Sequence, residues 1–131
     1  MKLIFLPIII FLHIFEDFHL QGILAHMKQY VWWINQEGFN KKYNYDYIVA
    51  LLLHSFEWAF VIHLPILCYN LNKITFRYNL VFIVSLIINT LIHAYVDNLK
   101  ANKHEINLIT DQLIHFCQII LIFLLFMGGI I

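Results

Sequence analysis

Long apolar stretches alternate with short polar ones along this chain. The apolar stretches cover residues 3–21, 46–70, 76–99 and 106–131. Each is close to the length of about 20 residues that a helix needs to cross a bilayer. The last two connections are short, and short connections make successive helices antiparallel neighbours. The pattern therefore predicts one transmembrane domain over residues 1–131, an all-α, up-and-down antiparallel four-helix bundle.

The longer segment between the first two spans, residues 22–45, mixes tryptophan and tyrosine with lysine. Amphipathic aromatic rings of this kind anchor at the headgroup level of a bilayer. We expect a short interfacial helix over residues 27–35 that ends near Gly38. This helix lies along the membrane surface or, alternatively, covers one end of the bundle as a lid.

Composition supports an integral membrane protein. The chain is 62% hydrophobic and 12% charged, against about 45–50% and about 25% in soluble domains. Lysine plus arginine equals aspartate plus glutamate at eight each, so no basic surface favours nucleic acid as a partner. The expected partner is membrane lipid, and a homo-oligomer is an alternative to a monomer.

Each apolar stretch carries one histidine–carboxylate pair at helical spacing. The pairs are His13/Asp17, His54/Glu57, His93/Asp97 and Asp111/His115. Residues three or four apart lie on one face of a helix. A charged group in the bilayer core costs at least about 2.5–3.5 kcal/mol on insertion scales, so such groups face the bundle interior and usually mark function.

Antiparallel packing should bring these pairs to one depth. Each histidine lies about six to nine residues from the same membrane face, or roughly 10–13 Å at about 1.5 Å per residue. Aspartate follows histidine in the first and third spans and precedes it in the fourth. All three aspartates therefore lie one turn nearer water than their histidines, whereas Glu57 lies one turn deeper. We expect a single polar layer.

Imidazole and carboxylate groups from facing helices are typical ligands of zinc, iron and manganese. The candidate ligands are His13, Asp17, His54, His93, Asp97, Asp111 and His115. One ion needs three or four of them and two ions would use nearly all, with zinc the first choice. The alternative is a hydrogen-bonded network that holds helices together or passes protons.

Two amide residues extend the polar stripes of the first and third spans. These residues, Gln21 and Asn89, are candidates for orienting the ligands from a second layer. Interhelical hydrogen bonding explains them equally well.

A metal-dependent hydrolase acting on a lipid or lipid-linked substrate is the leading functional hypothesis. A bound metal ion polarises a carbonyl or phosphoryl oxygen and makes a water more acidic. A carboxylate that does not bind the ion, with Glu57 and Asp111 the candidates, would act as general base. The alternatives are a transporter or channel for divalent metal ions or protons, and a structural membrane subunit.

The motifs as a set resemble a known family. They are His13-Ile-Phe-Glu-Asp17-Phe-His-Leu-Gln21, Leu53-His54, His93-Ala-Tyr-Val-Asp97 and Thr110-Asp111-Gln112-Leu-Ile-His115. Together they are similar to the bacterial and phage membrane family catalogued as domain of unknown function 3307. This resemblance implies a small multi-spanning protein of the bacterial inner membrane and no particular activity. The pattern is more distantly similar to that of membrane-bound metal-dependent hydrolases.

The distribution of basic residues gives an expected orientation. Five lie on the side of the polar layer, namely Lys28, Lys41, Lys42, Lys100 and Lys103, and three lie opposite, namely Lys2, Lys73 and Arg77. Cytoplasmic loops carry an excess of lysine and arginine. We therefore expect the site toward the cytoplasmic face.

Overall fold

The predicted all-α bundle is confirmed. The structure is a computed structural model that describes residues 2–38, 40–73 and 75–128, and this part of the chain is helical without strands. Four of its helices are long and apolar enough to cross a membrane: Lys2–Leu20, Lys41–Asn70, Phe76–Ala101 and Leu108–Met127. They overlap the four expected spans. The expected end of the fourth span, residues 129–131, lies outside the described residues.

The first crossing joins three helical types end to end. A 3₁₀ turn at Lys2–Ile4 leads into α1 (Phe5–Phe15), and a π-helical turn at Glu16–Leu20 follows. The remaining elements are α2 (Leu24–Met27), α3 (Tyr30–Ile34), a 3₁₀ turn at Lys41–Tyr43, α4 (Asp46–Asn70), a 3₁₀ turn at Leu71–Lys73, α5 (Phe76–Ala101) and α6 (Leu108–Met127).

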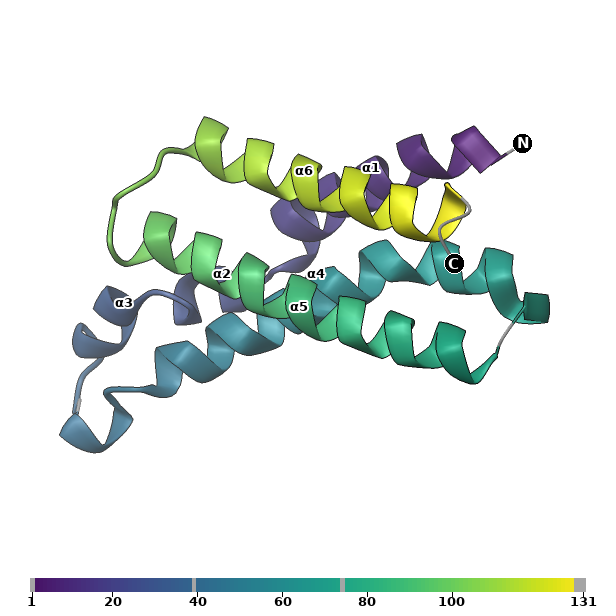
Figure 1. Cartoon of the computed structure of the whole chain (residues 1–131). Helices are drawn as coiled ribbons and strands as arrows, with labels where there is room; N and C mark the ends of the chain where they lie inside the picture. The colour runs from purple at the N-terminus through teal and green to yellow at the C-terminus, as the bar shows by residue number, and fades with distance from the viewer. Residues whose placement is uncertain (1, 39, 74, 129–131) are drawn as a thin grey trace.

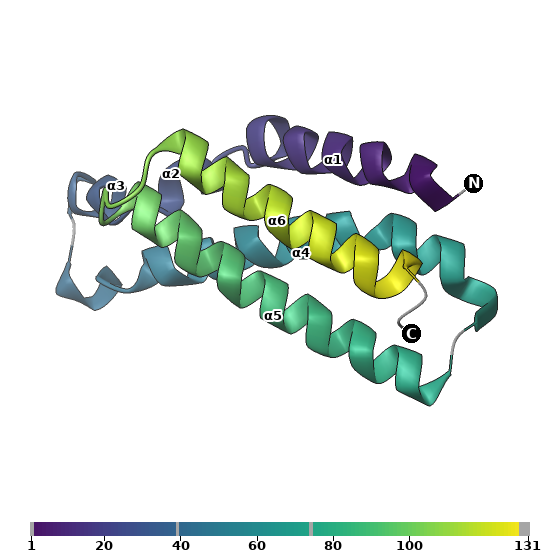
Figure 2. The same ribbon diagram turned by 45° about the horizontal axis from the view of Figure 1, so that its top comes forward.

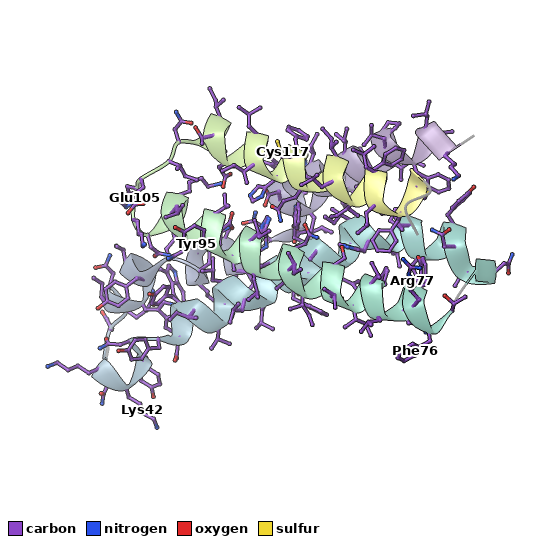
Figure 3. All side chains as sticks on the ribbon, in the orientation of Figure 1. Lys42, Phe76, Arg77, Tyr95, Glu105 and Cys117 are labelled. Atoms are coloured by element: carbon purple, nitrogen blue, oxygen red, sulfur yellow. The ribbon has the colours of Figure 1, made fainter. Side chains whose placement is uncertain are left out.

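The four long helices lie side by side and alternate in direction (Figure 1, Figure 2). Both termini and the α4–α5 connection lie at one end of the bundle. The short helices α2 and α3 and the α5–α6 connection lie at the other, which we call the lid end. Figure 3 places Lys42 and Glu105 at the lid end and Phe76 and Arg77 at the opposite end. The end of α1, the start of α4, the end of α5 and the start of α6 therefore meet, as antiparallel packing requires.

Side-chain caps begin the last two long helices. The Thr75 hydroxyl accepts a hydrogen bond from the Tyr78 N–H at 3.1 Å, and the Asn107 carbonyl oxygen accepts one from the Thr110 N–H at 2.9 Å. Both residues occupy the N-cap position, where such a bond satisfies a free helical N–H. These caps fix where α5 and α6 start.

The segment between the first two crossings forms a lid. The expected helix over residues 27–35 is shorter in the structure: α3 covers Tyr30–Ile34, and the extended Gln29 separates it from α2, which ends at Met27. The Trp33 indole N–H donates to the Met27 carbonyl oxygen at 2.7 Å, and this hydrogen bond connects α3 to α2. Gly38 has φ +76°, a conformation that glycine adopts readily. The lid packs on α4, and the side chain of Lys28, which follows α2, is buried in the bundle.

An apolar core occupies the half of the bundle away from the lid. Its isoleucines Ile9, Ile62, Ile66 and Ile119 are completely buried, and Phe126 belongs to the same cluster. Most of the buried polar residues of the four spans lie between this core and the lid, whereas His63 contacts Phe82 and Phe126 of the apolar half. The core therefore holds the helices together below the site and leaves the lid-end half for polar groups.

Candidate metal centre

Side chains from all four crossings and from the lid meet in one buried group, which we call the polar cluster. Its members are His13, Glu16, Asp17, Lys28, His54, His93, Asp97, Asp111 and His115, and none is more than 8% exposed. All seven residues expected as metal ligands lie in it. Glu16 and Lys28 also belong to it, although the sequence did not single them out.

Asp97 lies at the centre of the polar cluster. Its Oδ2 atom is 2.5 Å from Lys28 Nζ and 3.4 Å from His54 Nε2. Its Oδ1 atom is 3.5 Å from His115 Nε2 and 3.8 Å from His93 Nε2. One carboxylate of α5 therefore faces histidines from three helices and a lysine from the lid.

Three overlapping groups of described residues could hold a metal ion. They are Asp17/His54/His93, His93/Asp97/His115 and Asp17/Asp111/His115, and the ligand atoms within each group lie within 4.8 Å of one another. These six residues are the donor set. Two ligands of one tetrahedral zinc ion lie about 3.3 Å apart, given metal–ligand distances of about 2.0–2.1 Å. The spacings of 3.3 Å from His54 Nε2 to His93 Nε2 and 3.4 Å from His115 Nε2 to Asp111 Oδ1 fit such an ion.

Several atoms of the donor set have no hydrogen-bond partner among the described residues. Three of them are Asp97 Oδ1, Asp111 Oδ1 and His115 Nε2, and the histidine nitrogen lies 3.5 Å from the first and 3.4 Å from the second. Buried polar atoms in proteins are normally hydrogen-bonded. A cation bound to His115 and to either carboxylate would give both of its ligand atoms a partner.

Neighbouring amides determine which nitrogen of His115 faces the carboxylates. The Gln118 amide NH₂ donates to Asn89 Oδ1 at 3.1 Å, so its Oε1 accepts from His115 Nδ1 at 3.1 Å. If the ring is neutral, its proton therefore lies on Nδ1 and Nε2 carries a lone pair. This lone pair would point at Asp97 and Asp111, an arrangement that is repulsive unless a metal ion or a second proton lies on Nε2.

The same chain of hydrogen bonds continues toward the apolar core. The Asn89 amide NH₂ donates to the Ser85 carbonyl oxygen at 2.8 Å, and Ser85 Oγ lies 2.9 Å from His63 Nε2. His63 Nδ1 donates to the Ala59 carbonyl oxygen at 2.7 Å, so its Nε2 accepts from the serine hydroxyl. We call His115, Gln118, Asn89, Ser85 and His63 the polar relay.

His13 supports two carboxylates of the donor set. The Trp58 indole N–H donates to His13 Nδ1 at 2.7 Å, so the ring proton lies on Nε2 and is donated to Gln112 Oε1 at 3.1 Å. The Gln112 NH₂ then donates to Asp17 Oδ2 at 2.9 Å and to Asp111 Oδ2 at 3.1 Å. Both nitrogens of His13 are engaged and His13 belongs to none of the three groups that could hold a metal ion, so its hydrogen bonds fit a residue that orients candidate ligands better than a ligand.

The two amide residues expected to orient ligands both lie beside the donor set. The Gln21 amide NH₂ donates to Asp17 Oδ1 at 2.9 Å. Asn89 reaches His115 through Gln118, as described above. Each therefore contacts a ligand directly or through one intervening side chain.

Glu57 lies outside the polar cluster, contrary to the sequence prediction. Its side chain is exposed on the outer face of α4, and Trp58 occupies the inward position one turn beyond His54. Glu16 takes the inward place instead, with Oε1 3.4 Å from His54 Nδ1. The π-helical turn that starts at Glu16 widens the helix and turns this residue and Asp17 inward together. Such turns are frequent at functional sites.

The charges of the site are unbalanced. Four buried carboxylates, those of Glu16, Asp17, Asp97 and Asp111, face two ammonium groups. Lys28 pairs with Asp97, and Lys100 pairs with Asp111. With neutral histidines this leaves a formal charge of −2, and uncompensated buried charge is strongly unfavourable. One divalent cation would neutralise it, as would a proton on each of His54 and His115, which face these carboxylates.

Lys28 is held in place by Asn102, the residue that directly follows α5. The Asn102 amide NH₂ donates to the Lys28 carbonyl oxygen at 3.0 Å, and Asn102 Oδ1 accepts from the Tyr30 N–H at 2.7 Å.

The chain combines four candidate membrane helices with buried histidine–aspartate groups that could bind metal. No family model matches the sequence, and neither the curated proteins nor the solved structures contain a match to it.

Proposed function

We propose that the polar cluster binds one divalent metal ion and that the protein is a membrane metal-dependent hydrolase of a lipid or lipid-linked substrate. Three overlapping groups of buried histidines and aspartates, in each of which the ligand atoms lie within 4.8 Å of one another, carry the metal assignment. The formal charge of −2 favours one divalent ion over two.

Zinc is the ion that the donor set favours. Imidazole nitrogen and carboxylate oxygen are ordinary zinc ligands, and spacings near 3.3 Å suit a tetrahedral site. Iron and manganese bind the same donor types. Cys68 and Cys117 are both exposed and stay apart from the donor set.

Glu16 is the carboxylate best placed to act as general base. When bound, the ion would polarise a carbonyl or phosphoryl oxygen of the substrate and make a nearby water more acidic. Glu16 lies beside the donor set without belonging to its three groups, and its Oε2 has no hydrogen-bond partner among the described residues. It replaces Glu57 in this role. Asp111, the other candidate, is held by Gln112 and Lys100 and serves better as a ligand.

The position of the cluster supports the proposal of a lipid substrate. The four long helices suit a bilayer, and the cluster lies at their lid end beneath α2 and α3 (Figure 1). The lid carries the tryptophan and tyrosine residues that favour the headgroup region. A scissile bond at this depth belongs to the glycerol or headgroup part of a lipid.

Transport of protons or metal ions has less support from the geometry. The polar relay leads away from the cluster, but it passes through two amides and ends at the Ala59 carbonyl oxygen. Amide groups hold their protons and do not pass them along a chain. Beyond His63 lie the rings of Phe82 and Phe126, which belong to the apolar half of the bundle.

Glu16→Gln is expected to retain the metal ion and to lose hydrolysis by about 10²–10⁴-fold, the contribution usual for a general base. Elemental analysis of protein in lipid nanodiscs gives the metal content. Release of fatty acid or phosphate from phospholipid vesicles gives the activity. The matched control is Glu57→Gln, the same change on the exposed face of α4, which should alter neither. Purified wild-type protein without metal would refute the proposal.

Gln118→Leu is expected to weaken zinc binding by about 10–100-fold, as removal of a group that orients a metal ligand commonly does. Leucine cannot accept a hydrogen bond from the His115 Nδ1–H group. The imidazole ring is then free to rotate or to change tautomer. Zinc titration against a competing chelator measures the effect. Gln36→Leu is the matched control, because Gln36 is exposed on the lid. Equal zinc affinity in the Gln118 variant and the wild type would contradict the tautomer assigned to His115.

A further inference from the structure

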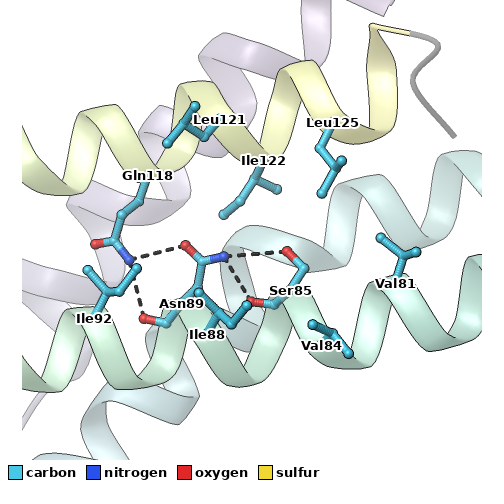
Figure 4. Close-up of a pocket in the computed structure, with 10 residues that line it drawn as sticks. All are labelled: Val81, Val84, Ser85, Ile88, Asn89, Ile92, Gln118, Leu121, Ile122 and Leu125. Carbon is cyan, nitrogen blue, oxygen red and sulfur yellow. Dashed lines mark hydrogen bonds between the residues drawn. The ribbon is translucent and has the colours of Figure 1, made fainter.

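A groove lies between α5 and α6 on the outer surface of the bundle (Figure 4). It has a volume of about 240 Å³. Its walls are branched aliphatic side chains, with Ile88 on α5 and Leu121 on α6 facing each other across it. Its floor carries Ser85, Asn89 and Gln118, which are three members of the polar relay.

The polar atoms on the floor are already engaged with one another. The Gln118 NH₂ donates to Asn89, the Asn89 NH₂ donates to Ser85, and Gln118 Oε1 accepts from His115. Figure 4 shows the bonds among these floor residues. The floor therefore offers little to a polar ligand, and an occupant gains contact mainly with apolar walls. Such an occupant is a hydrocarbon chain.

The groove runs in the direction that the chain of a bound lipid would take. At the end of the groove nearer the lid is Gln118, directly hydrogen-bonded to His115 of the polar cluster. From there it extends away from the lid to Val81 and Leu125. The α5 residues that line it cover positions 81–92, or roughly 16 Å of helix at about 1.5 Å per residue. A lipid whose head lies at the depth of the cluster would place its chain along this path.

We propose that this groove binds one acyl chain of the lipid substrate and so directs the headgroup end of that lipid toward the polar cluster. The inference rests on the proposed hydrolase function and adds to it the substrate class, a lipid with a straight hydrocarbon chain. Within a bilayer the chain is held by close van der Waals packing, since bulk lipid is equally apolar.

A phospholipid with a diazirine in its acyl chain tests the site in nanodiscs. Irradiation followed by peptide mass spectrometry should find more label on the wall residues of α5 and α6 than on the outward residues of these helices that do not line the groove. Ile88→Trp fills the groove and should remove this excess. Ile83→Trp is the matched control, since Ile83 is similarly exposed on α5 but does not line the groove. It should label like the wild type, and all three proteins should hold the same amount of metal.

The outcomes separate the two proposals. Equal labelling of α5 and α6 in Ile88→Trp and Ile83→Trp would overturn the acyl-chain site. Labelled groove residues in a protein that contains no metal would support the chain site and refute the hydrolase. A second copy of this chain is the competing occupant. Disulfide-linked dimers of Leu121→Cys, made after both native cysteines are changed to serine, would identify that copy and overturn the proposal.

Discussion

Replacing Asp97 with asparagine is expected to leave the protein without bound metal. The Asp97 carboxylate is completely buried and faces three histidines of the donor set. Asparagine keeps nearly the same shape but carries no negative charge, and divalent ions bind neutral amides far less well than carboxylates at sites of this type. The metal-to-protein ratio after purification, obtained by elemental analysis, measures the loss.

Two further variants make this result interpretable. Asp46→Asn applies the same change at the start of α4, outside the polar cluster, and should keep the metal. Asp97→Asn also leaves the Lys28 ammonium buried without its partner, and breaking a buried pair in this way costs about 3–5 kcal/mol. Asp97→Asn combined with Lys28→Met removes both partners and should recover most of that stability while still lacking metal. Full occupancy in either Asp97 variant would exclude Asp97 as a ligand.

Lys28→Met is expected to change stability and metal affinity in opposite directions. Without Lys28 the formal charge of the site falls from −2 to −3, because Asp97 loses its only ammonium partner among the described residues. In the presence of a chelator the variant should be less stable by about 3–5 kcal/mol, as expected for an uncompensated buried charge. A divalent ion then interacts with a more negative site, so zinc affinity should rise. Thermal unfolding with and without zinc, and zinc titration, measure the two effects.

Lys100→Met provides the comparison. Lys100 pairs with Asp111, but its side chain is 27% exposed. Water partly screens such a pair, and exposed pairs contribute about 0.2–1 kcal/mol. The Lys100 variant should therefore lose less stability in chelator than the Lys28 variant. If chelator and zinc affected the Lys28 variant and the wild type equally, the charge balance proposed for the site would be wrong.

Much of the polar cluster could be read from spacing along single helices. Pairs such as His93 and Asp97 lie one turn apart, so a regular helix sets both on one face whatever surrounds it. The same reasoning failed for Glu57, because a three-residue step leaves a side chain near the edge of the face and the neighbouring Trp58 took the inward position. Glu16 is also three residues from a histidine, yet the π-helical turn carries it inward.

The identity of the supporting residues required the assembled bundle. Gln112 joins Asp17 to Asp111 across two helices, and nothing in the local pattern around Gln112 distinguishes it from an ordinary polar residue near a helix start. His13 looked like a ligand by the same spacing rule as the other histidines. Its role changed because Trp58 from α4 supplies a donor to one ring nitrogen and Gln112 from α6 an acceptor to the other.

The amino-acid sequence by itself determined four apolar helices of spanning length, their alternation, and the helix face on which each histidine and aspartate lies. These properties are local, since they depend on hydropathy and on the 3.6-residue helical repeat. Only the tertiary structure decided which side chains meet. Lys28 reaches Asp97 across 69 residues of chain, and the free nitrogen of His115 is set by an amide bonded to another helix. Such contacts depend on how the helices and the lid pack, which no periodicity along the chain encodes.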